Sequence, residues 1–162
     1  MQLPEFDECI SAACAIANTD RLIVIGSQAV LAQTNAREIP KEVLMPNEVD
    51  VTTVHTALGL NDEKWRNISD EMLGAIEFHL GEDSPWHTAH GFYVETVDIG
   101  GAVLPTSWQD RVRSHQVRGG EFTAICLDAI DACTAKIMRG LDKDKQFTVS
   151  LIEIGLVDET RC

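Results

Sequence analysis

Two acidic residues, Glu48 and Asp50, stand two apart in a segment rich in β-branched residues, 48–54. On a β-strand, residues two apart point to the same face, so both carboxylates project together. Two neighbouring anions need solvent, a paired cation or a bound metal, and hard divalent ions prefer oxygen ligands. The pair therefore indicates either a site for Mg²⁺ (or Mn²⁺) or a solvent-facing acidic edge.

A second candidate element is Gly26-Ser27, which follows the continuous apolar run 22–25 and precedes the helix-like segment 28–33. A glycine at such a turn lets the backbone approach a ligand closely, and the start of a helix offers free N–H groups to a phosphate. Tight strand-to-helix turns also use this dipeptide for structural reasons alone. The turn is therefore a candidate phosphate contact or a purely structural element.

A third element is the basic row Lys136, Arg139 and Lys143, with spacings of three and four. On one helix these side chains would share a stripe turned away from Ile130, Ile137 and Leu141. The row could contact phosphate or the acidic half of the chain. A solvated helix face is the alternative.

The histidines and cysteines do not combine into a convincing site. His87-x-x-His90 falls in a predicted loop with His79 upstream, and no cysteine lies nearby to complete a tetrahedral zinc site. The five cysteines are scattered and form no CxxC pair, so we expect buried thiols.

The elements that must position these residues alternate along the chain. Apolar periodicity predicts helices over 5–17, 62–80, 128–141 and 144–154, and strands over 22–25, 48–54, 92–99 and 122–127. Asp128 is expected to cap its helix, and Gly81 to end the helix over 62–80. We predict one α/β (α+β) domain over 1–162, a mixed sheet flanked by helices, with a C-terminal helical part at about 128–158.

Charge is distributed unevenly along the sequence. The net charge is −13, but residues 1–105 hold 5 basic and 17 acidic residues, whereas residues 106–145 hold 7 basic and 6 acidic ones. Bulk acidity excludes a protein that coats nucleic acid or anionic membranes through charge. The N-terminus has no basic region before an apolar segment, and the apolar stretch 22–32 is too short to span a bilayer, so we expect a cytoplasmic protein.

In combination, these elements resemble the DNA polymerase β-like nucleotidyltransferase signature, hG[GS] followed by h[DE]h[DE]h. The closer resemblance is to bacterial nucleotidyltransferase-like proteins of the DUF6036 type, relatives of the AbiEii toxin family. The likeness extends over most of the chain, in an ordered set of segments at 25–29, 47–51, 86–93, 102–111, 126–131, 136–144, 147 and 155–157.

The resemblance implies a small nucleotidyltransferase-like mixed sheet, with Glu48 and Asp50 holding Mg²⁺ (or Mn²⁺) and Gly26 and Ser27 contacting the triphosphate of an NTP. Lys136, Arg139 and Lys143 become candidates to contact phosphate or an acceptor. The metal would neutralise phosphate charge and align an acceptor hydroxyl for in-line attack.

A third catalytic carboxylate is expected on the strand 92–99. Glu95 and Asp98 both lie there, but they have opposite parity, so only one can face Glu48 and Asp50. We take Asp98 as the candidate that completes the catalytic set.

Three functions follow from these residues. The first is a nucleotidyltransferase that transfers NMP to the hydroxyl of an RNA, a protein or a small molecule. The second is an inactive nucleotide- or RNA-binding module, or one component of a toxin–antitoxin pair with a partner protein. The third is a structural or homo-oligomeric protein in which Glu48 and Asp50 are only surface.

Overall fold

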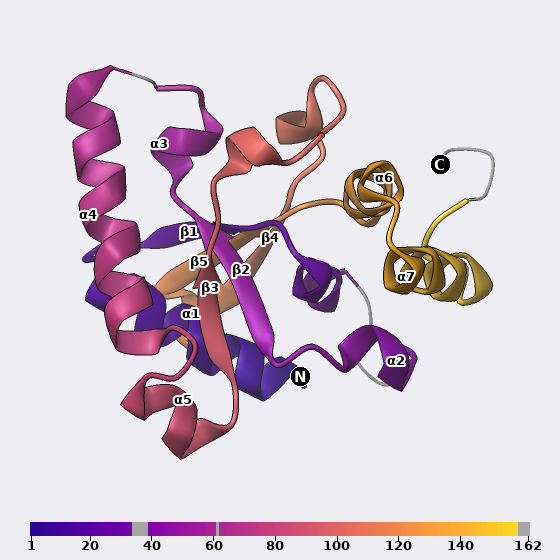
Figure 1. Cartoon of the computed structure of the whole chain (residues 1–162), viewed down its shortest axis with the longest axis horizontal. Coiled ribbons are helices and arrows are strands. Elements are labelled where there is room, and N and C mark those ends of the chain that lie inside the picture. Colours follow the sequence, from indigo (N-terminus) through magenta and orange to yellow (C-terminus); the bar gives the residue numbers. More distant parts are fainter. Residues whose placement is uncertain (34–38, 61, 159–162) are drawn as a thin grey trace.

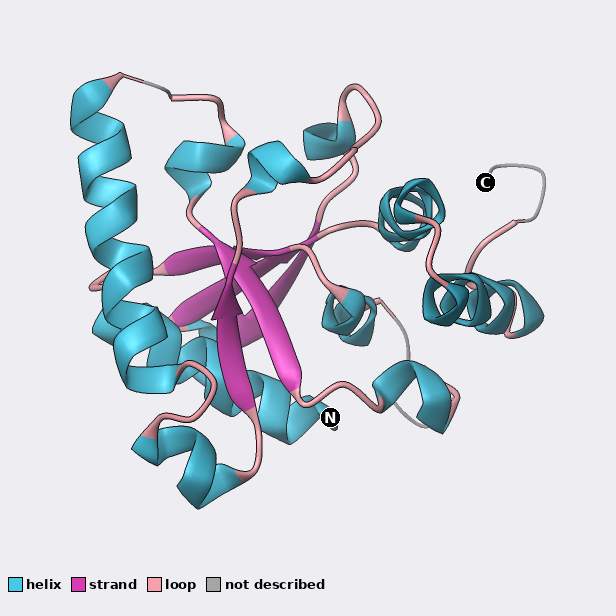
Figure 2. Cartoon of the chain, in the orientation of Figure 1, coloured by secondary structure: helices cyan, strands magenta, loops and turns pink. Residues whose placement is uncertain are grey.

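The computed structural model describes residues 1–33, 39–60 and 62–158. Within these ranges the strands form a single mixed sheet with helices on both of its faces, and two further helices follow the last strand (Figures 1 and 2). The chain therefore has the mixed α/β architecture that the sequence predicts.

The sheet has parallel and antiparallel neighbours in the order β3-β2-β1-β5-β4. Its strands are β1 (Arg21–Val24), β2 (Glu48–Thr52), β3 (Tyr93–Thr96), β4 (Arg113–Val117) and β5 (Phe122–Cys126). β1 is antiparallel to β2 and parallel to β5, β2 is parallel to β3, and β4 is antiparallel to β5. The carboxylate-bearing strand β2 thus lies between β1 and β3.

The helices form a layer on each face of this sheet. α1 (Leu3–Ile16) and α4 (Glu63–Leu80) pack together on one face, and the 3₁₀ helix η1 (Ser27–Ala32) lies on the other, next to α6 (Ala129–Arg139) (Figure 1). α7 (Asp142–Glu153) packs against α6, and α2 (Lys41–Leu44) contacts α7. The remaining helices are α3 (Val54–Ala57), α5 (Pro85–His90), η2 (Ile99–Gly101), η3 (Trp108–Asp110) and η4 (Arg118–Gly120).

The hydrophobic core extends over both faces of the sheet, and one part of it lies between the sheet and the α1–α4 layer. Phe6 and Ile10 of α1 and Ile76 and Leu80 of α4 are buried. Burial of each such side chain stabilises the fold by about 1.5–3 kcal/mol. This packing fixes the sheet that carries Glu48 and Asp50, and it leaves the opposite face of the sheet for η1 and α6.

Capping residues set the limits of α4 and α6. Asp62 accepts a hydrogen bond from Trp65 N at 3.0 Å, and Asp128 accepts one from Ile130 N at 3.0 Å, so the predicted cap at Asp128 is confirmed. α6 ends at Gly140, which adopts a left-handed conformation with φ of 76°. The predicted basic row is therefore divided, because Lys143 lies on α7 and not on the helix of Lys136.

Several other expectations need correction. The segment after Gly26 is a 3₁₀ helix, and the strand predicted over 92–99 is shortened to β3 (Tyr93–Thr96). The sequence patterns predict neither β4 nor α5. Ile137 and Leu141 are exposed, whereas Lys136 is partly buried, so α6 turns Lys136 and not Ile137 inward. Part of the predicted loop 34–47 forms α2, and its residues 34–38 lie outside the described ranges.

Two sequence expectations concern single features. Cys9, Cys14, Cys126 and Cys133 are buried, as expected, and Cys162 lies outside the described residues. Of the helices in the described ranges, none combines the length and apolarity that a membrane span requires.

Candidate functional site

Three carboxylates lie side by side at the β2–β3 pair. The register places Asp50 opposite Glu95 and Glu48 opposite Tyr93. Glu48 and Asp50 share one face of β2, while Val49 and Val51 between and beyond them are buried in the core. The alternation of the strand therefore brings Glu48, Asp50 and Glu95 together on the face that lies toward η1 and α6.

Asp50 is the electrostatic centre of this group. Burial raises the pKa of Asp50 to about 6, with further contributions from the charges of Glu95 and Glu48 and from a side-chain hydrogen bond with Glu95. Lys136 acts in the opposite direction. Glu48, Asp50 and Glu95 form no ion pair with Lys or Arg in the described part of the chain. The cluster thus carries negative charge that its immediate neighbours do not neutralise.

The turn after β1 leaves room for the Asp50 carboxylate only because residue 26 is glycine. A Cβ atom on Gly26 would lie 1.5 Å from Asp50 Oδ2 and 2.5 Å from its Cγ. The same turn is tied to β2 by Ile25 N, which donates to the Asp50 carbonyl at 3.1 Å. Gly26 therefore leaves the space that the Asp50 carboxylate occupies. The sequence pattern indicated a phosphate-binding turn at Gly26 and did not predict this role.

Basic side chains from α6 form the opposite wall. Arg139 makes a bidentate ion pair with the buried Asp144 of α7, with Nε 2.8 Å from Oδ2. Lys136 lies 3.7 Å from Asp144 and 4.8 Å from the centre of the Phe147 ring. Burial lowers the pKa of Lys136, as does the charge of Arg139, while Asp144 and Asp50 raise it.

A cleft between the two walls contains two adjoining cavities that share Asp50, Lys136 and Arg139. The charged cavity, of about 680 Å³, is lined by Ser27, Val43, Met45, Pro46, Glu48, Asp50, Glu95, Lys136, Arg139, Lys143, Asp144, Gln146, Phe147 and Ser150. The apolar cavity, of about 340 Å³, is lined by Ile25, Gly26, Asp50, Val97, Asp98, Ala102, Val103, Ala132, Ala135, Lys136, Met138 and Arg139. Each site residue predicted from the sequence lines one or both of these cavities.

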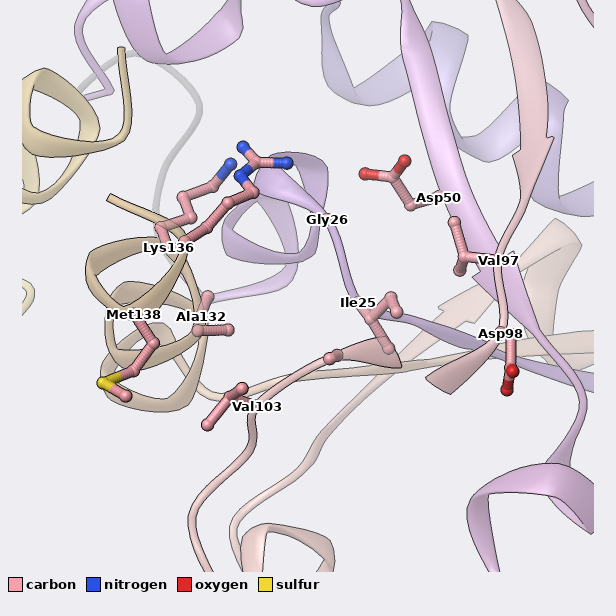
Figure 3. Close-up of a pocket in the computed structure, with 12 residues that line it drawn as sticks. Ile25, Gly26, Asp50, Val97, Asp98, Val103, Ala132, Lys136 and Met138 are labelled. Carbon is pink, nitrogen blue, oxygen red and sulfur yellow. The ribbon is translucent and has the colours of Figure 1, made fainter. Parts of the chain in front are cut away.

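Figure 3 shows the apolar cavity between these walls. The Asp50 carboxylate points across the cleft toward Lys136, and Ile25, Val103 and Met138 lie along the space beside them. Lys143 reaches the charged cavity although it belongs to a different helix from Lys136.

The placement of the third carboxylate differs from the expectation. Asp98 lies beyond the end of β3, and its Oδ1 accepts a hydrogen bond from Gly100 N at 2.9 Å. Its side chain points away from Asp50 (Figure 3). Glu95 is instead the residue paired with Asp50, so Glu95 and not Asp98 joins the carboxylate cluster.

The histidine segment lies on a helix and not on a loop. His87 and His90 belong to α5, where His90 stacks on Trp86 and pairs with Glu8 at 3.3 Å. Across the residues that the structure describes, no three His, Cys, Asp or Glu side chains are placed to hold one metal ion together.

A magnesium ion does not need three protein ligands. Mg²⁺ keeps several waters and commonly binds one or two carboxylates together with the phosphates of a substrate. Glu48 and Asp50 project from one strand face into the charged cavity, where neither makes an ion pair with Lys or Arg in the described ranges. The donor set therefore fits a hydrated divalent cation that a phosphate helps to hold.

Comparisons with protein-family models, with curated proteins and with solved structures find no match for this chain. The geometry of the site therefore carries the argument. Carboxylates on β2 and β3 form one wall, basic side chains on α6 and α7 form the other, and the cleft lies between them.

The Arg139–Asp144 pair gives a stability prediction. Asp144→Asn is expected to lower the free energy of unfolding by about 1–3 kcal/mol at pH 7, a range reduced for the half-exposed Arg139. Hydrogen bonding from Arg139 lowers the pKa of Asp144, so its stabilisation is present above the ordinary aspartate range and is lost as the pH falls. Urea denaturation at a series of pH values should show the two proteins converging as the pH falls below the ordinary aspartate pKa of about 3.9.

Asp142→Asn is the matched control for this variant. Asp142 lies two residues earlier on α7 and pairs with Lys145 at the surface, where an ion pair contributes at most about 1 kcal/mol. Equal losses of stability in the two variants would contradict a special role for the buried pair.

Proposed function

We propose that this chain is a metal-dependent nucleotidyltransferase that transfers NMP from an NTP to an acceptor hydroxyl. One observation carries the proposal: Glu48, Asp50 and Glu95 form a carboxylate cluster across a cleft from Lys136 and Arg139. Such a cleft offers a divalent cation on one side of a triphosphate and fixed positive charge on the other.

The roles of the residues follow from their positions. Glu48 and Asp50 would hold Mg²⁺ (or Mn²⁺), which when bound neutralises phosphate charge and polarises the reacting phosphoryl group. Lys136, Arg139 and Lys143 line the charged cavity and would bind the phosphates. Ser27 also lines this cavity, and Gly26 before it lines the adjoining apolar cavity. Glu95, opposite Asp50 in the strand register, would accept the proton of the attacking hydroxyl.

Label transfer tests the proposal directly. The protein is incubated with each α-³²P-labelled NTP, with Mg²⁺ or Mn²⁺, and with total RNA, protein and small-molecule extracts as acceptors. We expect metal-dependent label on one acceptor class and a rise in melting temperature when NTP and metal are present together. Glu95→Gln should abolish transfer, whereas Asp70→Asn, on the exposed surface of α4, should not.

Two results would distinguish other functions. NTP binding without transfer to any acceptor would identify a nucleotide-binding module. Absence of both transfer and metal-dependent NTP binding would contradict the proposal and leave the acidic cluster as a surface feature.

A further inference from the structure

The two cavities of the cleft differ sharply in chemistry. The charged cavity holds the basic side chains Lys136, Arg139 and Lys143 together with the carboxylates. The apolar cavity is lined mainly by aliphatic and alanine side chains, and among the described residues the basic ones that line it are Lys136 and Arg139 at the junction. The two spaces therefore meet at Asp50, where the metal and the reacting phosphorus would lie under the proposed function.

In an in-line displacement, the leaving group and the attacking group would occupy different cavities on the two sides of this junction. The attacking oxygen and the leaving oxygen lie on opposite sides of the phosphorus atom. Pyrophosphate, the leaving group, carries several negative charges and fits the charged cavity. The attacking hydroxyl then approaches from the apolar cavity.

We infer that the apolar cavity binds the acceptor, and that the acceptor is a small, uncharged, largely apolar alcohol. This inference rests on the proposed function and specifies its substrate. Ile25, Val97, Val103, Ala132, Ala135 and Met138 would contact the hydrocarbon part, while the hydroxyl lies near Asp50 (Figure 3).

The charges around the apolar cavity argue against an RNA acceptor. A polynucleotide needs cations along its path to neutralise successive phosphates. Two arginines of the segment that follows Val103 are already engaged: Arg111 makes a bidentate ion pair with the buried Asp131, and Arg113 pairs with Asp128. Phosphates that extended from this cavity would thus meet cations that carboxylates already neutralise.

The size and the rim of the cavity fit a small apolar ligand. Its volume of about 340 Å³ lies at the lower end of the range for small-molecule sites. Val103 is 56% exposed and Met138 62% exposed, so its apolar surface continues to the outside. Exposed aliphatic side chains beside a cavity are typical of a ligand entrance.

The step balances without a further reactant. The alcohol oxygen forms a bond to the α-phosphorus while the bond from that phosphorus to the bridging oxygen of the β-phosphate breaks. Pyrophosphate leaves with the electron pair of that bond. The hydroxyl proton passes through the carboxylate of Asp50, which lines both cavities, to its hydrogen-bonded neighbour Glu95, and Glu95 releases it to solvent. The products are a nucleotidyl ester of the alcohol, pyrophosphate and the proton.

The experiment offers competing acceptors to the full chain. The protein is incubated with α-³²P-labelled NTPs and Mg²⁺, with n-hexanol, phenethyl alcohol, a short single-stranded RNA with a free 3′ hydroxyl, or a serine-containing peptide. Metal-dependent NTP binding is measured separately by calorimetry. We expect label on the alcohols. Label on the RNA or the peptide alone, with NTP binding intact, overturns this inference and leaves the proposed function standing, whereas no NTP binding overturns both.

A variant that fills the cavity locates the acceptor. Ala135→Leu adds bulk on α6, where leucine is well tolerated by a helix. We expect transfer to n-hexanol to fall by about tenfold or more, with NTP affinity unchanged, because pocket contacts of this size discriminate by such factors. Ala15→Leu on the exposed face of α1 is the control and should leave both unchanged.

Methyl NMR on the wild-type protein provides a test that does not depend on turnover. Addition of n-hexanol should shift the methyl signals of Met138 and Val103, and a non-hydrolysable NTP with Mg²⁺ should not. Shifts of these methyl groups by the nucleotide in place of the alcohol would assign the cavity to the nucleobase and overturn the inference.

Discussion

Replacement of Asp50 by asparagine is expected to abolish nucleotidyl transfer and at the same time to raise the melting temperature of the metal-free protein. Transfer is lost because a neutral amide cannot replace an anionic metal ligand, and charge stabilisation by the metal contributes several kcal/mol. Since each 1.36 kcal/mol changes a rate tenfold, we expect a loss of at least about 100-fold. Label transfer under saturating NTP and Mg²⁺ measures it.

The gain in stability follows from the electrostatics of the cluster. Burial, and then the charges of Glu95 and Glu48, raise the pKa of Asp50 to about 6, so ionisation of this partly buried group opposes folding at neutral pH. Asparagine removes this free-energy cost of ionisation, which is on the order of 1–3 kcal/mol after allowance for solvent screening. For a chain of this size, each kcal/mol shifts the melting temperature by about 2–4 °C.

The pH dependence of this effect has a definite sign. Because the native pKa of Asp50 lies above its ordinary value of about 3.9, the native state holds the proton more tightly. The wild-type protein is therefore expected to lose this part of its stability as the pH rises from about 4 to about 6, while Asp50→Asn is not. Thermal denaturation in the presence of a chelator measures both curves. Equal pH profiles, or a less stable variant at pH 8, would contradict the role assigned to Asp50.

Substitution of Gly26 by alanine should have the second-largest effect. The new Cβ atom would overlap the Asp50 carboxylate and also lie 2.9 Å from Asp50 Cβ, so the carboxylate must turn out of its position. We expect metal-dependent NTP binding to weaken by about 10–100-fold, the range seen when groups that orient metal ligands are lost. Isothermal titration with NTP and Mg²⁺ measures the change.

A double-mutant cycle separates this clash from a general effect on the turn. In an Asp50→Gly background the Gly26→Ala substitution meets no carboxylate, so its effect on the free energy of unfolding should be much smaller than in the wild type. Gly74→Ala is the control, because an added Cβ there has nothing within 4 Å. On the helix α4 it should stabilise by about 1 kcal/mol. Additive effects of Gly26→Ala and Asp50→Gly would contradict the proposed contact.

Local sequence patterns predict those elements that local physics determines. The apolar run before Gly26 and the alternation over 48–54 correspond to β1 and β2, because burial on one or both faces leaves a clear pattern. β4 (Arg113–Val117) has no such pattern, since it is an edge strand with mostly exposed side chains. The six-residue helix α5 is too short for periodicity to reveal.

The candidate site depends on features that lie beyond the local sequence. The choice between Glu95 and Asp98 depends on the register of β3 against β2 and on the end of β3 at Thr96, and neither follows from parity. The turn at Gly140 separates α6 from α7, and Lys143 of α7 then lines the same cavity as Lys136 of α6. The importance of Asp144 could be inferred from its nearness to Arg139 in the sequence, but its burial could not.

The order of the strands has a consequence for how this protein must fold. The central strand β1 joins β5 in parallel, with Ile23 opposite Ile125, so segments from opposite ends of the chain must meet before the sheet is complete. Pairings between such distant segments carry a high entropy of loop closure and slow the folding of a domain. Asp128 and the start of α6 come directly after β5, and α6 therefore reaches its place only when that pairing has formed. The basic wall of the cleft should be among the last parts to acquire protection from hydrogen exchange during refolding.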